Sequence, residues 1–130
     1  MKKVLLWLLP VVDIFALRRI LKYYRSLGIR VPWGHAKLGV IERWVGYMPA
    51  GFIIGWFAGF WIASAIMFAI LALLGPIELH LMCRGVKPWK FFKRKPSKLV
   101  AKIFLLEGYN AIGYYLLGAL LAVVIDILFL

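Results

Sequence analysis

Four of the five acidic residues in this 130-residue chain lie in or beside strongly apolar segments, namely Asp13, Glu78, Glu107 and Asp126. An ionisable group in such a segment is costly to bury, so it usually faces protein, water or a charged partner. The chemistry that these groups offer is the transfer of ions or protons. Glu107 and Asp126 are about 28 Å apart if they share one helix, so they form no carboxylate pair.

Glu78, His80 and Cys83 suggest a metal site only at first sight. His80 and Cys83 are three residues apart and can share a helical face, but Glu78 and His80 point in different directions. A transition-metal site needs three or four convergent ligands, and His35 is the one other histidine. We therefore expect no metal site.

The sequence contains no motif that we associate with catalysis. A nucleophile elbow, a glycine-rich phosphate loop and a zinc-binding HExxH are all missing from it. We expect a protein that is not an enzyme and has no cofactor apart from bound phospholipid. Asn110 is a polar residue within an apolar segment, and hydrogen bonding between helices is its expected role.

The basic residues avoid the longest apolar segments. All seventeen fall at Lys2 and Lys3, between positions 18 and 43, or between 84 and 102, and they leave 45–83 and 103–130 without a cation. Both apolar segments exceed the roughly 18 to 20 residues that a helix needs to cross a bilayer. The chain is also 65% hydrophobic with a mean hydropathy of +0.90. These features predict an all-α integral membrane protein.

The formal net charge of +12 would fit a nucleic-acid-binding protein. Because the cations flank apolar segments, anionic lipid head groups explain the charge more simply, and we do not expect nucleic acid as a partner. Within the membrane-protein class the sequence favours the plasma membrane or an inner membrane.

The chain divides by composition into alternating membrane segments and basic segments. We predict a membrane-associated amphipathic helix over 1–26, a basic loop over 27–44, a glycine-faced transmembrane segment over 45–83, a basic aromatic loop over 84–102 and a transmembrane helix over 103–130. The two transmembrane helices are expected at about 50–74 and 104–128.

The number of membrane crossings stays open in the sequence. The strong break at Gly75 and Pro76 favours a single crossing by 45–83. The positive-inside rule favours a four-span form in which 45–83 is a helical hairpin, because most cations then share one face. We give slightly more weight to the break, which is a local steric fact.

Small residues predict a helix-packing surface of the glycine-zipper type. Gly51, Gly55 and Gly59 recur every four residues and Ala63 continues the row, while Gly118 and Ala122 form a second pair of small residues. Helices approach closely at such positions, and close contact drives their association in lipid. The partner helix can belong to this chain, to a copy of it or to another protein.

Basic residues at two places predict contacts with lipid phosphates. Arg18, Lys22 and Arg25 share one face of the N-terminal helix, opposite an apolar stripe. The second group, Arg84, Lys87, Lys90, Lys93, Arg94 and Lys95, is interleaved with aromatic residues.

Three functions are consistent with these features. The first is a non-catalytic subunit that assembles into a larger membrane complex and binds anionic lipid through its basic loops. The second is self-assembly, as a filament subunit or a small oligomeric pore, because the arrangement of two apolar helices around a basic loop over 45–130 resembles that of conjugative pilins, without a matching motif. The third is an ion or proton path through Glu78, Glu107 or Asp126.

Overall fold

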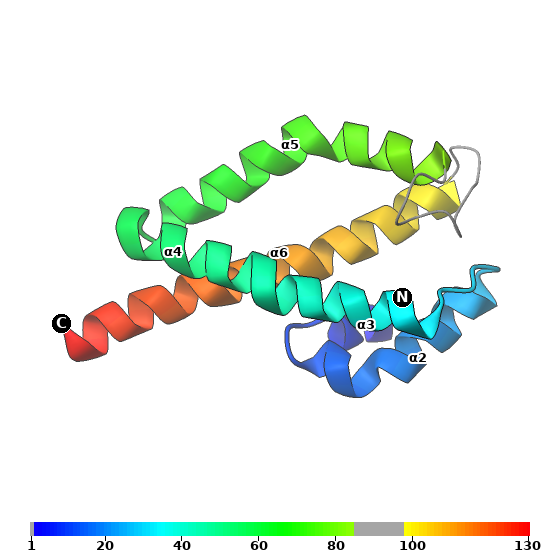
Figure 1. The fold of residues 1–130 in the computed structure, drawn as a ribbon, viewed down its shortest axis with the longest axis horizontal. Coiled ribbons are helices and arrows are strands. Elements are labelled where there is room, and N and C mark those ends of the chain that lie inside the picture. The colour runs from blue at the N-terminus through cyan, green and yellow to red at the C-terminus, as the bar shows by residue number, and fades with distance from the viewer. Residues whose placement is uncertain (1, 85–97) are drawn as a thin grey trace.

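The computed structural model describes residues 2–84 and 98–130, and the regular structure in these ranges is entirely helical. The elements are α1 (Lys2–Trp7), α2 (Val12–Ser26), α3 (Trp33–Glu42), the π-helical η1 (Arg43–Tyr47), α4 (Met48–Ala58), α5 (Phe60–Arg84) and α6 (Lys98–Phe129). The predicted all-α class is therefore confirmed. Figure 1 shows α4 beside α6, α5 returning along them, and α1 with α2 against the first half of α6.

The N-terminal segment is a helical hairpin, not the single helix predicted over 1–26. The chain turns between α1 and α2, where Pro10 offers no backbone N–H and Val11 has a φ of 70°. The buried stripe of α2, formed by Ala16, Ile20 and Tyr24, then packs with Ile103 and Leu106 of α6. The burial of this stripe against α6 fixes the position of the hairpin.

A Schellman motif ends α2. The amide of Gly28, whose φ is 88°, donates to the carbonyl of Arg25, and the amide of Ile29 donates to the carbonyl of Tyr24, each at 3.0 Å. The basic loop predicted over 27–44 is consequently short, because α3 begins directly after Pro32.

One long helix is formed by α3, η1 and α4 in succession. Its middle, Arg43–Tyr47, is a π-helical turn with wider i→i+5 hydrogen bonding. The charged residues of α3 and the glycines of α4 therefore belong to one continuous element.

Gly59 reverses the chain, so the helix predicted over 50–74 is interrupted. Its φ of 88° and ψ of 165° are accessible chiefly to glycine. The Gly59 amide donates to Gly55, which ends α4, and the Ala63 amide donates to Gly59 in the first turn of α5. Val45–Cys83 is thus two helices joined at Gly59, and of these α5 contains the stretch that is long and apolar enough to cross a membrane, Phe60–Leu81.

The predicted break at Gly75 and Pro76 is also wrong, because α5 continues through both residues. Proline removes one hydrogen bond and commonly kinks a helix, and α5 is visibly bent along its length (Figure 1). The helix predicted over 104–128 lies within the longer α6, which begins inside the segment that we had predicted as a loop over 84–102. Residues 85–97 of that loop lie outside the described residues.

The backbones of α4 and α6 touch where both helices have small residues. A Cβ on Gly51 would overlap the carbonyl group of Tyr115, and one on Gly55 would lie 2.8 Å from the Cα of Ala119. From the other side, a Cβ on Gly118 would overlap the carbonyl oxygen of Met48. The partner of the glycine row is therefore α6 of the same chain.

The remaining members of the predicted packing set behave differently from one another. Ala63 and Ala122 are fully buried, and Ala63 packs with Tyr115 and Met67. The Tyr115 hydroxyl donates to the Ala63 carbonyl at 2.7 Å. Gly59 does not belong to this surface, because a Cβ there would have no neighbour within 4 Å.

Two helices are long and apolar enough to cross a membrane. They are Phe60–Leu81 within α5 and Ala101–Phe129 within α6. Only 17% and 28% of their most apolar stretches are buried, so most of this surface faces outward. The side chains of Trp61 and Leu73, for example, are 82% and 74% exposed.

Candidate functional site

A chamber of about 230 Å³ lies among α2, α3 with η1, α5 and α6. Its walls include four of the five acidic residues of the chain, Asp13, Glu42, Glu78 and Glu107. Arg43 is the single Lys or Arg among the described residues that line it. Four carboxylates against one guanidinium give the described part of the wall a formal charge of −3, in a chain whose total is +12.

Glu107 is held from two sides. The Tyr24 hydroxyl of α2 donates to Glu107 Oε1 at 2.7 Å, and Arg43 donates through Nη2 to Glu107 Oε2 as an ion pair. The Arg43 side chain is 16% exposed and that of Glu107 is 38% exposed, so the pair is shielded on the side of Arg43 and partly open to solvent on the side of Glu107. Because Arg43 is the first residue of the π-helical turn, the pair ties η1 to α6.

Asp13 is held by neutral donors. It accepts hydrogen bonds from the Tyr114 hydroxyl and from Asn110 Nδ2, both on α6. The Tyr114 hydroxyl also accepts from the Val11 amide at 3.1 Å, and Asn110 Nδ2 donates to the Leu8 carbonyl at 2.6 Å. These bonds fix the turn between α1 and α2 on the middle of α6.

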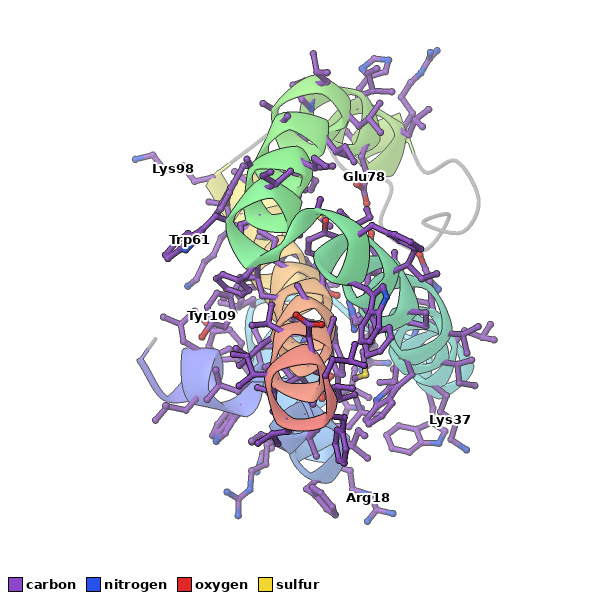
Figure 2. All side chains as sticks on the ribbon, turned by 90° about the vertical axis from the view of Figure 1, so that its left-hand side faces the viewer. Arg18, Lys37, Trp61, Glu78, Lys98 and Tyr109 are labelled. Carbon is purple, nitrogen blue, oxygen red and sulfur yellow. The ribbon has the colours of Figure 1, made fainter. Side chains whose placement is uncertain are left out.

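Glu42 and Glu78 differ from the other two acids. Among the described residues neither carboxylate has a hydrogen bond or an ion pair, and the charges of Glu42 and Glu107 both repel that of Glu78. Figure 2 shows Glu78 extending from α5 toward the space beside α3 and η1. Glu42 and Glu78 are therefore the carboxylates best placed to meet a ligand.

His35 adds little charge to the wall. Burial lowers the pKa of His35 below its ordinary value, although the carboxylates of Glu107 and Glu42 act in the opposite direction. A histidine with a lowered pKa is neutral at pH 7. His35 therefore does not neutralise the negative charge of the chamber.

Most of the remaining wall is apolar. Leu17, Ile20 and Leu21 contribute one apolar surface from α2, and Ile103 and Phe104 contribute another from α6. The rings of Tyr24 and Tyr47 also line the space. The chamber therefore combines acidic groups with a surface that suits hydrocarbon.

The chamber ends where the glycine contact begins. Its lining extends along the long helix to Tyr47 and along α6 to Ala111. Directly beyond these residues, Gly51 and Gly118 bring the backbones of α4 and α6 together. The lining therefore does not extend between α4 and α6 toward the Gly59 turn.

The structure brings together three of the four acids singled out from the sequence, Asp13, Glu78 and Glu107, and separates the fourth. Asp126 lies near the far end of α6 and is exposed. The lipid-binding candidates Arg18, Lys22, Arg25 and Arg84 are exposed, while Lys87, Lys90, Lys93, Arg94 and Lys95 lie outside the described residues. No cluster of three His, Cys, Asp or Glu in the described part of the chain could hold a metal ion.

Three residues of the site were not identified as such from the sequence: Glu42, Arg43 and Tyr24. Glu42 is the one acid inside a basic block, directly before Arg43, and that position was the available signal. Arg43 lies within the basic loop predicted over 27–44 and was given no role of its own. Its pairing with Glu107, 64 positions later, depends on tertiary structure.

Comparison of the chain with protein-family models, with curated proteins and with solved structures finds no match.

Proposed function

We propose that this chain is an integral membrane protein that binds a cationic ligand in the acid-lined chamber, without catalysing a reaction. The membrane part of the proposal is supported by α5 and α6. A long helix in the core of a soluble protein is mostly buried, whereas the apolar stretches of these two helices are mostly exposed. A continuous apolar surface of this size is stable when lipid covers it.

The distribution of charge supports one orientation. The end of α2, the start of α3, the end of α5 and the start of α6 all lie at one end of the molecule (Figure 1). Exposed cations lie at these element ends: Arg25 in the last turn of α2, Arg84 at the end of α5 and Lys98 at the start of α6. We therefore expect this basic end to face the cytoplasm and the anionic lipid head groups.

Cysteine labelling tests the membrane part. We would place a single cysteine at either end, as R84C or L130C, in a C83S background, and treat right-side-out vesicles with a membrane-impermeant maleimide. One position should react before lysis and the other only after it. Equal reaction of both positions before lysis would contradict a membrane-crossing α6.

The convergence of the acids is the observation that carries the ligand part. Residues far apart in the sequence place four carboxylates around one space, and Arg43 is already paired with Glu107. Glu42 is exposed and Glu78 is half-buried, and the charges of Glu42 and Glu107 repel that of Glu78, so a counter-charge beside Glu78 would be favourable. A bound cation would supply it at Glu42 and Glu78.

The ligand part is tested by thermal unfolding of the full chain in lipid nanodiscs. A ligand that binds only the folded state raises the unfolding temperature. We expect sodium chloride, potassium chloride or butylammonium chloride, compared at constant ionic strength, to stabilise the parent. The E42Q/E78Q variant should lose this effect, and D126N, which changes an acid outside the chamber, should keep it.

If no cation stabilises the parent more than E42Q/E78Q, the chamber is not a cation site. Transport is a separate matter, because the lining of the chamber does not extend between α4 and α6 toward the Gly59 turn. We expect proton and sodium flux in proteoliposomes to stay at the level of empty vesicles. Flux that E78Q abolishes would instead favour an ion path.

A subunit role in a larger complex is a second candidate, and the end of α6 favours it. Ile127, Leu128 and Phe129 are 74%, 69% and 76% exposed, beyond the contact of Gly55 with Ala119. A neighbouring subunit could cover this apolar end. Native mass spectrometry after mild extraction would show other chains bound to it, a homo-oligomer as in the pilin or pore alternative, or a monomer, which would contradict both.

A further inference from the structure

We infer that the membrane boundary crosses this molecule obliquely, with α2 among anionic lipid head groups and the opposite part of α5 in hydrocarbon. The inference rests on the proposed function, because it takes α5 and α6 as membrane-spanning helices and names the part of the lipid that each side of the bundle meets. Two surfaces at one height along α6 carry it, a cationic surface on α2 and an apolar surface on α5.

Both surfaces lie beside the same short stretch of α6. The Tyr24 hydroxyl of α2 donates to Glu107 at 2.7 Å, and a Cβ on Gly75 of α5 would lie 3.6 Å from the ring of Phe104. Glu107 and Phe104 are three residues apart, which is about 4.5 Å along a helix. Figures 1 and 2 show α2 and α5 on opposite sides of α6. The outer faces of α2 and α5 are therefore exposed at the same height.

The outer face of α2 is cationic. Its exposed residues include Arg18, Arg19, Lys22 and Arg25, and the one acid of α2, Asp13, is buried against α6. A basic side chain is costly to place in hydrocarbon, whereas a layer of lipid phosphates supplies its counter-charge. This face therefore suits anionic head groups.

The outer face of α5 at this height is apolar. Leu73, Leu74 and Ile77 are 74%, 55% and 57% exposed, and α5 has no Lys or Arg before Arg84. A boundary perpendicular to α6 would place either these side chains among head groups or the α2 cations in hydrocarbon. A tilted bundle satisfies both surfaces, and membrane-spanning helices are tilted by roughly 20° on average.

The surface of α2 also changes along the helix in the direction that this boundary requires. The start of α2 lies beside the middle of α6, because Asp13 accepts a hydrogen bond from Asn110 Nδ2. There Ile14 and Phe15 are 42% and 85% exposed, which suits lipid tails. The cations begin at Arg18 and continue toward the basic end of the molecule. We therefore place the boundary at the first two turns of α2.

The depth of spin labels in lipid nanodiscs tests this boundary. Single nitroxides would be attached to the full chain at K22C on α2 or L74C on α5, each in a C83S background, with L120C in the second half of α6 as the reference. The discs contain phosphatidylcholine with a minority of phosphatidylglycerol. We expect a water-soluble nickel complex to reach the label at K22C, and oxygen dissolved in the lipid to reach those at L74C and L120C.

Lipid selectivity tests whether the cations of α2 hold it among head groups. Spin-labelled lipids report how strongly the layer around the protein prefers phosphatidylglycerol to phosphatidylcholine. R18Q/K22Q should lower this preference, by up to about fivefold for each cation removed from an anionic surface. R30Q/K37Q removes two exposed cations outside α2 and changes the net charge equally, so it is the matched control and should have a smaller effect. Circular dichroism shows whether each variant is folded.

The reference label separates failure of this inference from failure of the proposed function. If L120C lies in hydrocarbon while K22C and L74C lie at equal depth, the oblique boundary is overturned and the membrane-spanning helices remain. An equal loss of lipid preference in R18Q/K22Q and R30Q/K37Q would overturn the assignment of α2 as the head-group surface. If the nickel complex reaches L120C as readily as K22C, the proposed membrane function fails together with the inference.

Discussion

The long helix formed by α3, η1 and α4 meets α6 in two ways along its length. At Gly51 and Gly55 the two backbones are in contact, with no room for a Cβ. At Glu42 and Arg43 the same pair of helices borders the chamber, and side chains span the gap between them. Small residues allow α4 to contact the backbone of α6, whereas near Glu42 and Arg43 the chamber separates the long helix from α6.

This difference shows how a short chain can contain both a tightly packed helix contact and an acid-lined chamber. In the proposed membrane setting the hydrophobic effect would not favour contact between helices, and close backbone approach would supply the association energy. Once the glycine contact fixes α4 on α6, the first half of each helix can carry charges that contribute little to packing. The predictions below test this division of roles.

The largest effect is expected from enlarging the glycine contact. Gly51→Leu would drive a side chain into the Tyr115 carbonyl group, and we expect a loss of about 3 kcal/mol in unfolding free energy, or failure to fold. Phe57→Leu is the matched control on α4, because Phe57 is 83% exposed. Chemical denaturation in detergent measures both, and equal stability of the two variants would contradict the contact.

The second-largest loss of stability is expected when the ion pair between Arg43 of η1 and Glu107 of α6 is broken. Glu107→Gln leaves Arg43 without its counter-charge, and we expect a loss of about 2 kcal/mol, below the value for a fully buried pair because the Glu107 side chain is 38% exposed. A double-mutant cycle with Arg43→Gln should show a positive coupling energy. Additive losses would mean that the pair does not join η1 to α6.

Tyr114→Phe should have a smaller and more local effect. It removes the hydroxyl that bridges Asp13 and the Val11 amide, which should cost about 1–2 kcal/mol. Hydrogen exchange at Val11 should become faster while exchange in α4 stays unchanged. Tyr109→Phe, also on α6 and 39% exposed, is the control and should leave Val11 protected.

The smallest effect on stability is expected where the proposed ligand binds. Glu42→Gln with Glu78→Gln should change the unfolding free energy by less than about 0.5 kcal/mol, in the stabilising direction, because repelling charges are removed. Measured without added amine, this separates a binding role from a structural one. A loss comparable to that of Glu107→Gln would show that these acids hold the fold together.

The sequence predicted which small residues pack closely better than it predicted where the chain turns. The four-residue spacing correctly pointed to close packing at Gly51 and Gly55, but the same spacing includes Gly59, where a positive φ reverses the chain. Gly75 and Pro76 looked like the stronger break, yet α5 continues through them. Glycine spacing does not encode φ, and proline is tolerated in membrane helices when neighbouring groups compensate for its missing N–H.

The site was harder to predict than the helices. The unusual positions of Asp13, Glu78 and Glu107 were visible in the sequence, but their convergence depends on the turn at Gly59 and on the hairpin of α1 and α2. Glu42 was missed because it lies inside a basic loop and not in or beside an apolar segment. Identifying it required knowing that α3 is a helix and that it faces α5.

The π-helical turn at Arg43–Tyr47 determines where a residue could be deleted from the long helix without changing which side chains face α6. Arg43 and Gly51 are eight residues apart, and in a regular α-helix this separation would place them about 80° apart around the helix axis. A separation of seven residues would place them within about 20° of each other. The wide turn absorbs one residue, which lets both face α6. Deleting Val45, which is 71% exposed, should therefore be tolerated. Deleting a residue within α4 should rotate the glycines away from α6.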